Sequence, residues 1–236
     1  AAAAAAEIFD NFNLDLMFAL PGQTFDELEK DISTALSFGS PHLSYYQLTI
    51  EPNTYFGKYE PANLPDDDIR ADMSDLVAES LVQKGLEHYE ISGYARPGFQ
   101  CRHNLNYWQY GDYFGIGPGA HGKLTRDKQI WRTVSAMNPE LWKEKVHSGG
   151  TGLVKDIKTP QEDIPFEFML NVLRLREGVP TELWEKRTFL SYASIRSTVE
   201  KLQNVGMLVK TPNLLKTTET GWNFLNCVQE EFLCTK

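Results

Sequence analysis

Three short apolar segments alternate with two amphipathic patterns over residues 12–95, and this alternation restricts the possible folds more than any other feature. We expect strands at FNLDLMFAL (12–20), HLSYYQLTI (42–50) and LEHYEISGYA (86–95). The segments between them carry apolar residues at helical spacing. Strand, helix, strand, helix, strand at these lengths predicts a parallel sheet covered by helices.

Both expected helices have a recognisable start and end. Thr24 and Glu27 form a T-x-x-E capping box, and Gly39 is the expected stop of the first helix. Asp66–Asp68 precede the second helix, which we expect to end at Gly85. Three acidic residues at a helix start complement the helix dipole, and a divalent-cation site is the alternative interpretation.

Ligands of parallel α/β folds bind where the strands end. This rule places Asp15, the 49–54 loop and the loop after residue 95 along one rim of the sheet. Asp15 stands in an otherwise apolar strand, so it needs a polar partner or water. It is either a ligand contact or a structural carboxylate that anchors the next turn.

Residues 96–123 are rich in glycine and aromatic residues and have few helix signals, so we expect a functional loop. Within it, HNLNYW (103–108) combines a histidine and an amide with two large aromatic residues. His103 could reach the iron of a flat ligand that Tyr107 and Trp108 face. Alternatively, His103 and Asn104 cap a turn while the aromatic residues pack in the core.

A second glycine-rich stretch, GIGPGAHG (115–122), allows the backbone to approach a ligand closely. It lacks both the GxGxxG spacing and the lysine of a phosphate-binding loop. A tight turn that needs glycine only for its backbone angles explains the stretch equally well.

The character of the chain changes after residue 125. We expect a connecting segment over 126–159, where HSGGTG (147–152) reads as a linker. Over 160–236 the pattern is helix, helix, helix, hairpin and a last helix, which is the order of a winged-helix unit. The expected domains are therefore 1–125, 126–159 and 160–236.

Composition excludes several classes of protein. The 236-residue chain carries a net charge of −9, which disfavours nucleic acid as its main partner. No apolar run in the sequence is long enough to span a membrane, and we expect no secretory signal because no basic segment precedes an apolar one. The three cysteines form no CxxC pair, and three unpaired thiols are typical of a reducing cytoplasm.

Four stretches, in order, resemble one known family. NLDLMFALPGQT (13–24), HLSYYQLTIEPNT (42–54), HNLNYW (103–108) and GDYFGIGPGAHG (111–122) are similar to the oxygen-independent coproporphyrinogen-III oxidase-like family of radical S-adenosylmethionine (SAM) proteins, and most similar to its haem-chaperone branch. The resemblance implies an α/β fold, the C-terminal part of a partial (β/α)6 barrel followed by a small winged-helix-like domain.

The resemblance also implies roles for individual residues. SAM would bind across the carboxyl ends of the barrel strands, and haem would be held by the HNLNYW stretch with His103 at the iron. The SAM contacts carried over are Asp15, Tyr46, Thr49 and His121, and the haem contacts are His103, Asn104, Tyr107 and Trp108.

Two departures from the family pattern bear on activity. Ala19 replaces a glycine before Leu-Pro, a change that we expect to matter little. The CxxxCxxC motif that holds the 4Fe–4S cluster is absent, and Cys101, Cys227 and Cys234 are too far apart to replace it. The resemblance therefore implies a chain that begins near the fifth barrel strand, with the cluster ligands in a missing N-terminal part. As written, the chain is expected to perform no radical chemistry.

Three functions follow as hypotheses. The first is a cytoplasmic haem chaperone that delivers haem to acceptor proteins. The second is the oxygen-independent oxidative decarboxylation of coproporphyrinogen III. The third is a winged-helix module that binds nucleic acid or an adaptor, which the near-balance of acidic and basic residues over 160–236 disfavours.

Overall fold

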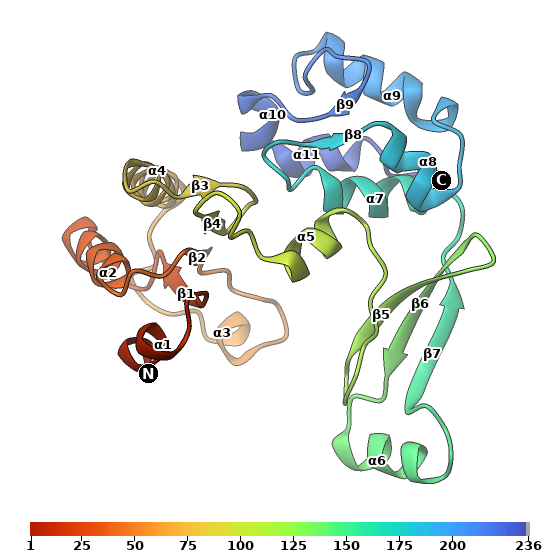
Figure 1. Cartoon of the computed structure of the whole chain (residues 1–236), viewed down its shortest axis with the longest axis horizontal. Coiled ribbons are helices and arrows are strands. Elements are labelled where there is room, and N and C mark those ends of the chain that lie inside the picture. Colours follow the sequence, from red (N-terminus) through yellow and green to blue (C-terminus); the bar gives the residue numbers. More distant parts are fainter. Residues whose placement is uncertain (235–236) are drawn as a thin grey trace. The chain divides into compact units, whose positions relative to one another are not determined.

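The computed structural model describes residues 1–234, and the chain forms two compact units (Figure 1). The first unit is Ala1–Cys101, and the second begins at Arg102. The elements of the first unit are α1 (Ala2–Ile8), β1 (Asn13–Phe18), α2 (Phe25–Ser37), β2 (His42–Gln47), α3 (Tyr55–Lys58), α4 (Asp67–Gln83), β3 (Glu87–His88) and β4 (Gly93–Ala95).

The sheet of the first unit has the strand order β1-β2-β4-β3. Strands β1 and β2 are parallel, with Asn13 opposite His42 and Phe18 opposite Gln47. Strand β4 pairs antiparallel with both β2 and β3. The parallel pair expected from the sequence is confirmed, together with the helix that joins its strands.

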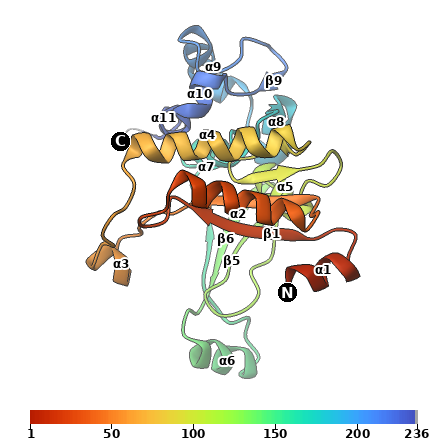
Figure 2. The same cartoon turned by 90° about the vertical axis from the view of Figure 1, so that its left-hand side faces the viewer.

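The core of the first unit lies between this sheet and helices α2 and α4. Leu28 and Ile32 of α2 and Met73 and Leu81 of α4 are buried against strand residues such as Leu43. In Figure 2 the two helices run side by side, with β1 next to α2. Both helices begin as expected: the capping box of Thr24 and Glu27 is present, and the Asp66 side chain accepts a hydrogen bond from the amide of Ile69.

The third expected strand, 86–95, is wrong as a single parallel strand. Two very short strands occupy this segment, and the chain reverses between them so that β4 runs antiparallel to β2. The reversal is tight: the amide of Gly93 donates to the carbonyl of Glu90. A Cβ atom at Gly93 would collide with the side chains of Tyr89 and Glu90, so glycine is required at this turn.

The second unit combines a three-stranded sheet with a mainly helical C-terminal part. Its sheet has the antiparallel order β5-β6-β7, and α6 joins the last two strands (Figure 1). The elements are α5 (Arg102–Trp108), β5 (His121–Arg126), β6 (Gln129–Ser135), α6 (Pro139–His147), β7 (Leu153–Lys158), α7 (Ile164–Val172), β8 (Val179–Pro180), α8 (Glu182–Thr188), α9 (Ala193–Asn204), β9 (Leu214–Leu215), α10 (Glu219–Asn223) and α11 (Leu225–Glu230).

Two segments hold more regular structure than the sequence analysis expected. Within the expected loop 96–123, residues 102–108 form α5, so HNLNYW is helical. The expected connecting segment 126–159 contains β6, α6 and β7, and HSGGTG (147–152) covers the end of α6 and the turn into β7. The domain boundaries 1–125, 126–159 and 160–236 remain a prediction.

The C-terminal part contains three helices in the expected order, followed by a strand that pairs with an earlier one. Helices α7, α8 and α9 bury Phe168, Trp184 and Ile195, and the Phe168 and Trp184 rings meet edge to face at 5.1 Å. Strand β9 returns to pair antiparallel with β8, which precedes α8. A further antiparallel bridge joins Leu208 and Thr217, so the segment between them forms a wing-like loop.

Candidate functional site

The two faces of the β1–β2 pair differ in chemistry. Leu14, Leu16 and Phe18 pack toward the core, whereas Asn13, Asp15 and Met17 alternate with them and are exposed. The parallel register places these exposed residues beside His42, Ser44 and Tyr46 of β2. We call the face that carries these residues of both strands the inner face. It consists of Asn13, Asp15, Met17, His42, Ser44 and Tyr46. Asp15 and Tyr46 therefore lie on one face of the sheet. Asp15 is the third of the six residues of β1, not at its carboxyl end, where the sequence analysis expected it.

Hydrogen bonds connect Asp15 to buried residues of the inner face. Asn13 Nδ2 donates to Asp15 Oδ1 at 2.8 Å, and Asn13 Oδ1 lies 2.7 Å from Nδ1 of His42. His42 Nε2 lies 2.8 Å from the hydroxyl of Tyr89. His42 is 3% exposed and Tyr89 is 7% exposed. Burial lowers the pKa of His42, and the charge of Asp15 opposes this shift.

The other two residues expected to bind SAM in this unit are also open to solvent. Tyr46 is 42% exposed near the carboxyl end of β2. Thr49 follows the strand and is exposed, with its hydroxyl 3.5 Å from the carbonyl oxygen of Gln47. Asp15 Oδ2 accepts no hydrogen bond from any residue in 1–234, so this oxygen can accept one from a ligand hydroxyl.

The sequence analysis missed three members of this network: Asn13, His42 and Tyr89. Nothing in the sequence distinguishes His42, because no second histidine stands at metal-ligand spacing from it. Polar residues at alternate positions of two otherwise apolar strands are the signal that could have found the network. Asn13 and Asp15 have this i, i+2 spacing in β1, and His42 and Ser44 have it in β2.

In the second unit, α5 presents a row of aromatic rings. The exposed ring of His103 meets Tyr107 edge to face, with 4.5 Å between centroids. Tyr107 in turn meets Tyr113 edge to face at 4.3 Å. Desolvation, followed by the proximity of Tyr113, raises the pKa of Tyr107. The imidazole of His103 forms no hydrogen bond with residues 1–234, so both of its nitrogens are accessible.

Trp108 and Asn104 lie on the same helix and are partly buried. The guanidinium of Arg174, which follows α7, lies 4.4 Å from the Trp108 ring centroid, a cation–π distance. The indole Nε1 of Trp108 is buried without a hydrogen-bond partner in the described part of the chain. Buried indole N–H groups usually have a partner, so the Trp108 N–H is an exception within the described residues.

We call the rings of His103, Tyr107 and Tyr113 the aromatic row. A network of charged residues contacts this row at Tyr113. Lys123, with a side chain 2% exposed, donates to Asp112 at 2.9 Å and to the carbonyl of Tyr110 at 3.1 Å. Arg132 contacts Glu167 at 2.6 Å, and Tyr110 donates to the same carboxylate at 2.9 Å. Burial lowers the pKa of Lys123, which the hydrogen bond to Asp112 opposes. This network joins β5 and β6 to α7 and supports Tyr113, whose hydroxyl accepts from Arg132 at 3.3 Å.

His121, the remaining residue expected to contact SAM, is exposed at the start of β5 in the second unit. The glycine-rich loop before it folds back on its own backbone. A Cβ atom at Gly115 would overlap the carbonyl of His121, and one at Gly122 would overlap the hydroxyl of Thr133. Gly115 and Gly122 are therefore needed because the chain approaches itself closely, and Gly117 and Gly119 have the positive φ angles that a tight turn requires.

The described residues offer no ligand set for a metal cluster. Cys227 and Cys234 are exposed, and Cys101 is partly buried. No group of three or more His, Cys, Asp or Glu side chains in residues 1–234 could hold a metal ion. The residues present do not fit a 4Fe–4S cluster.

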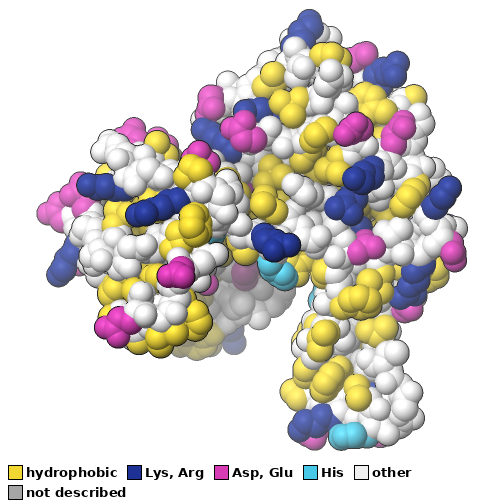
Figure 3. Space-filling view, viewed as in Figure 1, with side chains coloured by type: hydrophobic (Ala, Val, Ile, Leu, Met, Phe, Trp, Pro, Cys, Tyr) yellow, Lys and Arg dark blue, Asp and Glu magenta, His cyan; other side chains and the backbone are white. Residues whose placement is uncertain are grey.

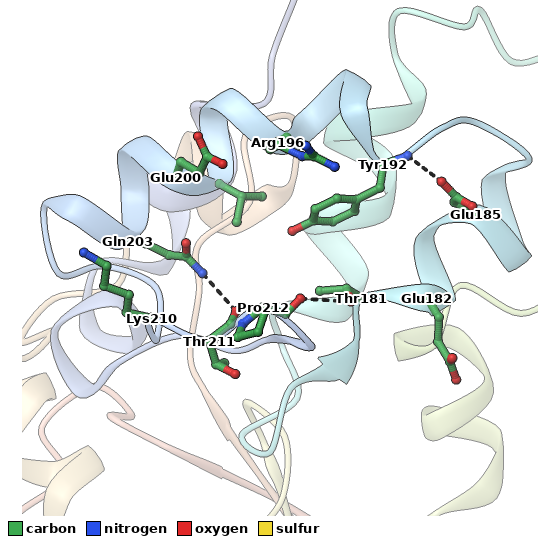
Figure 4. A pocket seen from close by; sticks show the side chains of 11 residues that line it. Thr181, Glu182, Glu185, Tyr192, Arg196, Glu200, Gln203, Lys210, Thr211 and Pro212 are labelled. Carbon is green, nitrogen blue, oxygen red and sulfur yellow. Dashed lines mark hydrogen bonds between the residues drawn. The ribbon is translucent and has the colours of Figure 1, made fainter.

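A cleft of about 500 Å³ lies beside α9 in the C-terminal part (Figure 4). Acidic Glu182, Glu185 and Glu200 and basic Arg196 and Lys210 line it together. Two of its polar groups are occupied, since Glu185 accepts from the amide of Tyr192 and Gln203 donates to the carbonyl of Thr211. The sequence analysis did not anticipate this cleft.

Residues 1–234 contain no helix with the length and apolar character needed to cross a membrane.

Comparison with known proteins identifies relatives of both units. Residues 159–224 match the HemN C-terminal domain. The haem chaperone HemW of Haemophilus influenzae is 42% identical over 224 residues, which cover 94% of this chain and 57% of that protein. The haem chaperone HemW of Escherichia coli is also 42% identical over 224 residues, covering 94% of this chain and 58% of that protein. The chain thus spans less than two thirds of the length of these relatives.

A solved structure supports the fold. The chain is similar to the coproporphyrinogen III oxidase HemN of Escherichia coli, described as a radical SAM enzyme, with a TM-score of 0.76 and 16% identity. The match covers 99% of this chain and 57% of that one. The expected fold class and the resemblance read from the four motifs are confirmed.

Proposed function

We propose that this chain is part of a haem chaperone, and that the complete protein binds haem and delivers it to haem-requiring proteins. Its 42% identity to two HemW proteins and its match to the HemN C-terminal domain support the proposal. The single observation that carries the proposal is the aromatic row of α5. It combines an exposed imidazole that has no hydrogen-bond partner within residues 1–234 with rings that can face a porphyrin.

His103 is proposed as the iron ligand because haem iron accepts one protein imidazole and this one is accessible. Tyr107 holds the imidazole by an edge-to-face contact at 4.5 Å. Asn104 and Trp108 are proposed to contact the porphyrin or its carboxylates from neighbouring positions of the helix. The buried indole N–H of Trp108, which has no partner in the described chain, supports this role.

A haem titration of the complete protein followed at the Soret band tests the assignment. His103→Ala is expected to weaken haem binding by about tenfold or more, because an iron–nitrogen bond is lost. His147→Ala is the matched control, since His147 is also an exposed helical histidine of the second unit. Equal affinity of the two variants would contradict the role of His103.

SAM is proposed as a cofactor of the complete protein. When it is bound, SAM supplies radical chemistry in this class of proteins. Within this chain, Asp15 would accept hydrogen bonds from SAM hydroxyl or amino groups, and Tyr46 and Thr49 of the same unit would also contact SAM. His121 of the second unit is proposed as a further SAM contact. The free Oδ2 of Asp15 and the exposure of Tyr46 support these contacts. The 4Fe–4S cluster is proposed only for the complete protein, since no cysteine set for it is present here.

Oxidative decarboxylation of coproporphyrinogen III is the second candidate. The likeness of fold to HemN favours it, although at 16% identity that likeness concerns the fold alone. Turnover of coproporphyrinogen III by the complete, anaerobically reconstituted protein would support decarboxylation over delivery of haem. A cytoplasmic location, expected from three unpaired cysteines, remains a prediction.

Nucleic-acid binding by the C-terminal part is not favoured by its charges. On the face shown in Figure 3, basic and acidic side chains are interspersed. Lys201 pairs with Glu231 at 2.6 Å, and Lys216 pairs with Glu177 at 3.1 Å. A surface of this kind presents no continuous basic patch for a phosphate backbone.

A further inference from the structure

The carboxylate of Asp15 fixes the direction of every hydrogen bond in the inner-face network. An ionised carboxylate only accepts, so the Asn13 group that faces it is the amide N–H. The amide oxygen of Asn13 then faces His42, and the Nδ1 of His42 must carry a proton to donate to it. In a neutral imidazole Nε2 is therefore the acceptor, and the hydroxyl of Tyr89 donates to it.

The remaining contacts agree with this direction. The amide of Cys101 donates to the hydroxyl oxygen of Tyr89 at 3.3 Å, which leaves the hydroxyl proton for His42. The hydroxyl of Ser44 donates to the amide oxygen of Asn13 at 3.3 Å, so that oxygen accepts two hydrogen bonds. The network is a single directed chain of donors that ends on Oδ1 of Asp15.

The hydrogen-bond network begins at buried residues and ends at exposed ones. His42 is 3% exposed and Tyr89 is 7% exposed, and their rings meet edge to face at 5.6 Å. Asn13 and Asp15 are exposed residues of β1. Exposed side chains sample several rotamers, and a fixed hydrogen-bond partner reduces the entropy that ligand binding would otherwise remove.

We propose that His42 is a positioning residue of the SAM site, which holds the Asp15 carboxylate through Asn13. With Oδ1 held by Asn13, Oδ2 is presented on the exposed side of the sheet. This inference rests on the proposed role of Asp15 in binding SAM. His42 contacts no ligand itself, and its effect is transmitted by two hydrogen bonds.

Two substitutions at His42 separate positioning from packing. In His42→Asn, the side-chain amide lies near the position of Nδ1 and can still donate to Asn13. In His42→Gln, the longer amide reaches toward the Nε2 position and Tyr89, so the donor to Asn13 is lost. We expect His42→Gln to raise the Kd for SAM about tenfold, and His42→Asn to restore most of the wild-type affinity.

The measurement is equilibrium dialysis of labelled SAM against the complete, anaerobically reconstituted protein. Circular dichroism with urea unfolding is the control for folding of each variant, and haem affinity from a Soret titration checks that the second unit, which holds the proposed haem site, is unaffected. Tyr89→Phe is a milder variant that keeps the ring and removes only the hydroxyl, and we expect it to weaken SAM binding about threefold.

Asp15→Asn distinguishes failure of this inference from failure of the proposed function. If Asp15→Asn binds SAM as tightly as the wild type, the SAM assignment of Asp15 is wrong. If Asp15→Asn binds weakly while His42→Gln and His42→Asn bind equally, Asp15 contacts SAM but His42 does not position it. If folded Tyr89→Phe binds SAM as tightly as the wild type, the proposal that His42 positions Asp15 is also wrong.

Discussion

At the residue scale, Lys123 is an unusual buried cation. Its side chain is 2% exposed, and its ammonium lies 2.9 Å from Asp112 and 4.2 Å from the Tyr110 ring centroid. A buried charge is tolerated only when it is paired and hydrogen-bonded, and Lys123 meets both conditions. The pair fixes the end of the segment that follows α5, so it bears on the placement of the proposed haem site.

Removal of this cation should destabilise the second unit. We expect Lys123→Met to lower the free energy of unfolding by about 2 kcal/mol, because the carbonyl of Tyr110 loses its donor and Asp112 keeps only the hydrogen bonds from Thr125. All five tryptophans of the chain belong to the second unit, so urea unfolding followed by tryptophan fluorescence reports this change. Lys143→Met, which breaks only an exposed pair with Glu140, should change stability by less than about 0.5 kcal/mol. Equal stability of the two variants would contradict the role of Lys123.

Ala19 illustrates two opposing effects at one position. Its φ of 58° lies in the left-handed region, where a Cβ atom costs about 1 kcal/mol, and its methyl group is 1% exposed. Burial of one methyl group returns about 0.8 kcal/mol. We therefore expect Ala19→Gly to change the free energy of unfolding by less than about 0.5 kcal/mol, as measured by urea unfolding with circular dichroism. A gain above about 1 kcal/mol would show that strain dominates.

Residue-level prediction worked where local chemistry was sufficient. The sequence required a polar partner or water for Asp15, and the structure provides both, since Asp15 is exposed and accepts a hydrogen bond from Asn13. His42 could not be recognised in the same way, because its partners Asn13 and Tyr89 lie 29 and 47 residues away in sequence. Such a network becomes visible only when the parallel register of β1 and β2 is known.

At the element scale, the period of apolar residues predicted the long helices, whereas the short strands and helices were not predicted. Helices α2 and α4 carry several turns of buried apolar residues, and their starts were correct. Strands β3 and β4 have two and three residues, too few to show a period. Helix α5 has seven residues with weak helix propensity, and it is supported by tertiary contacts such as Arg174 on Trp108.

The start of α2 provides a test at this scale. Thr24 accepts a hydrogen bond from the amide of Glu27 at 3.3 Å, and its own amide donates to the Glu27 side chain at 2.8 Å. We expect Thr24→Ala to lower the free energy of unfolding by about 1 kcal/mol, measured by urea unfolding with circular dichroism. Thr34→Ala, an exposed change inside the same helix, is the control and should stay within about 0.5 kcal/mol. Equal effects would mean that the cap contributes nothing.

At the scale of the whole molecule, the proposed ligands divide between the two units. Three of the residues proposed for SAM belong to the first unit, whereas His121 and all four residues proposed for haem belong to the second. The alternation of strands and helices predicted β1, α2, β2 and α4 of the first unit but not its antiparallel strand β4, and the expected order of helices agrees with the C-terminal part. The β5-β6-β7 sheet was not predicted because its strands show no regular alternation of buried and exposed residues; in β7, for example, five of six residues are exposed.

The most direct test of the haem assignment is electron paramagnetic resonance of the ferric haem complex of the complete protein. The wild type and the His147→Ala control are predicted to share a spectrum typical of imidazole-ligated iron. His103→Ala is predicted to lose the imidazole features, because the ligand on α5 is gone. An unchanged spectrum in His103→Ala would show that the iron is bound elsewhere and would contradict the account.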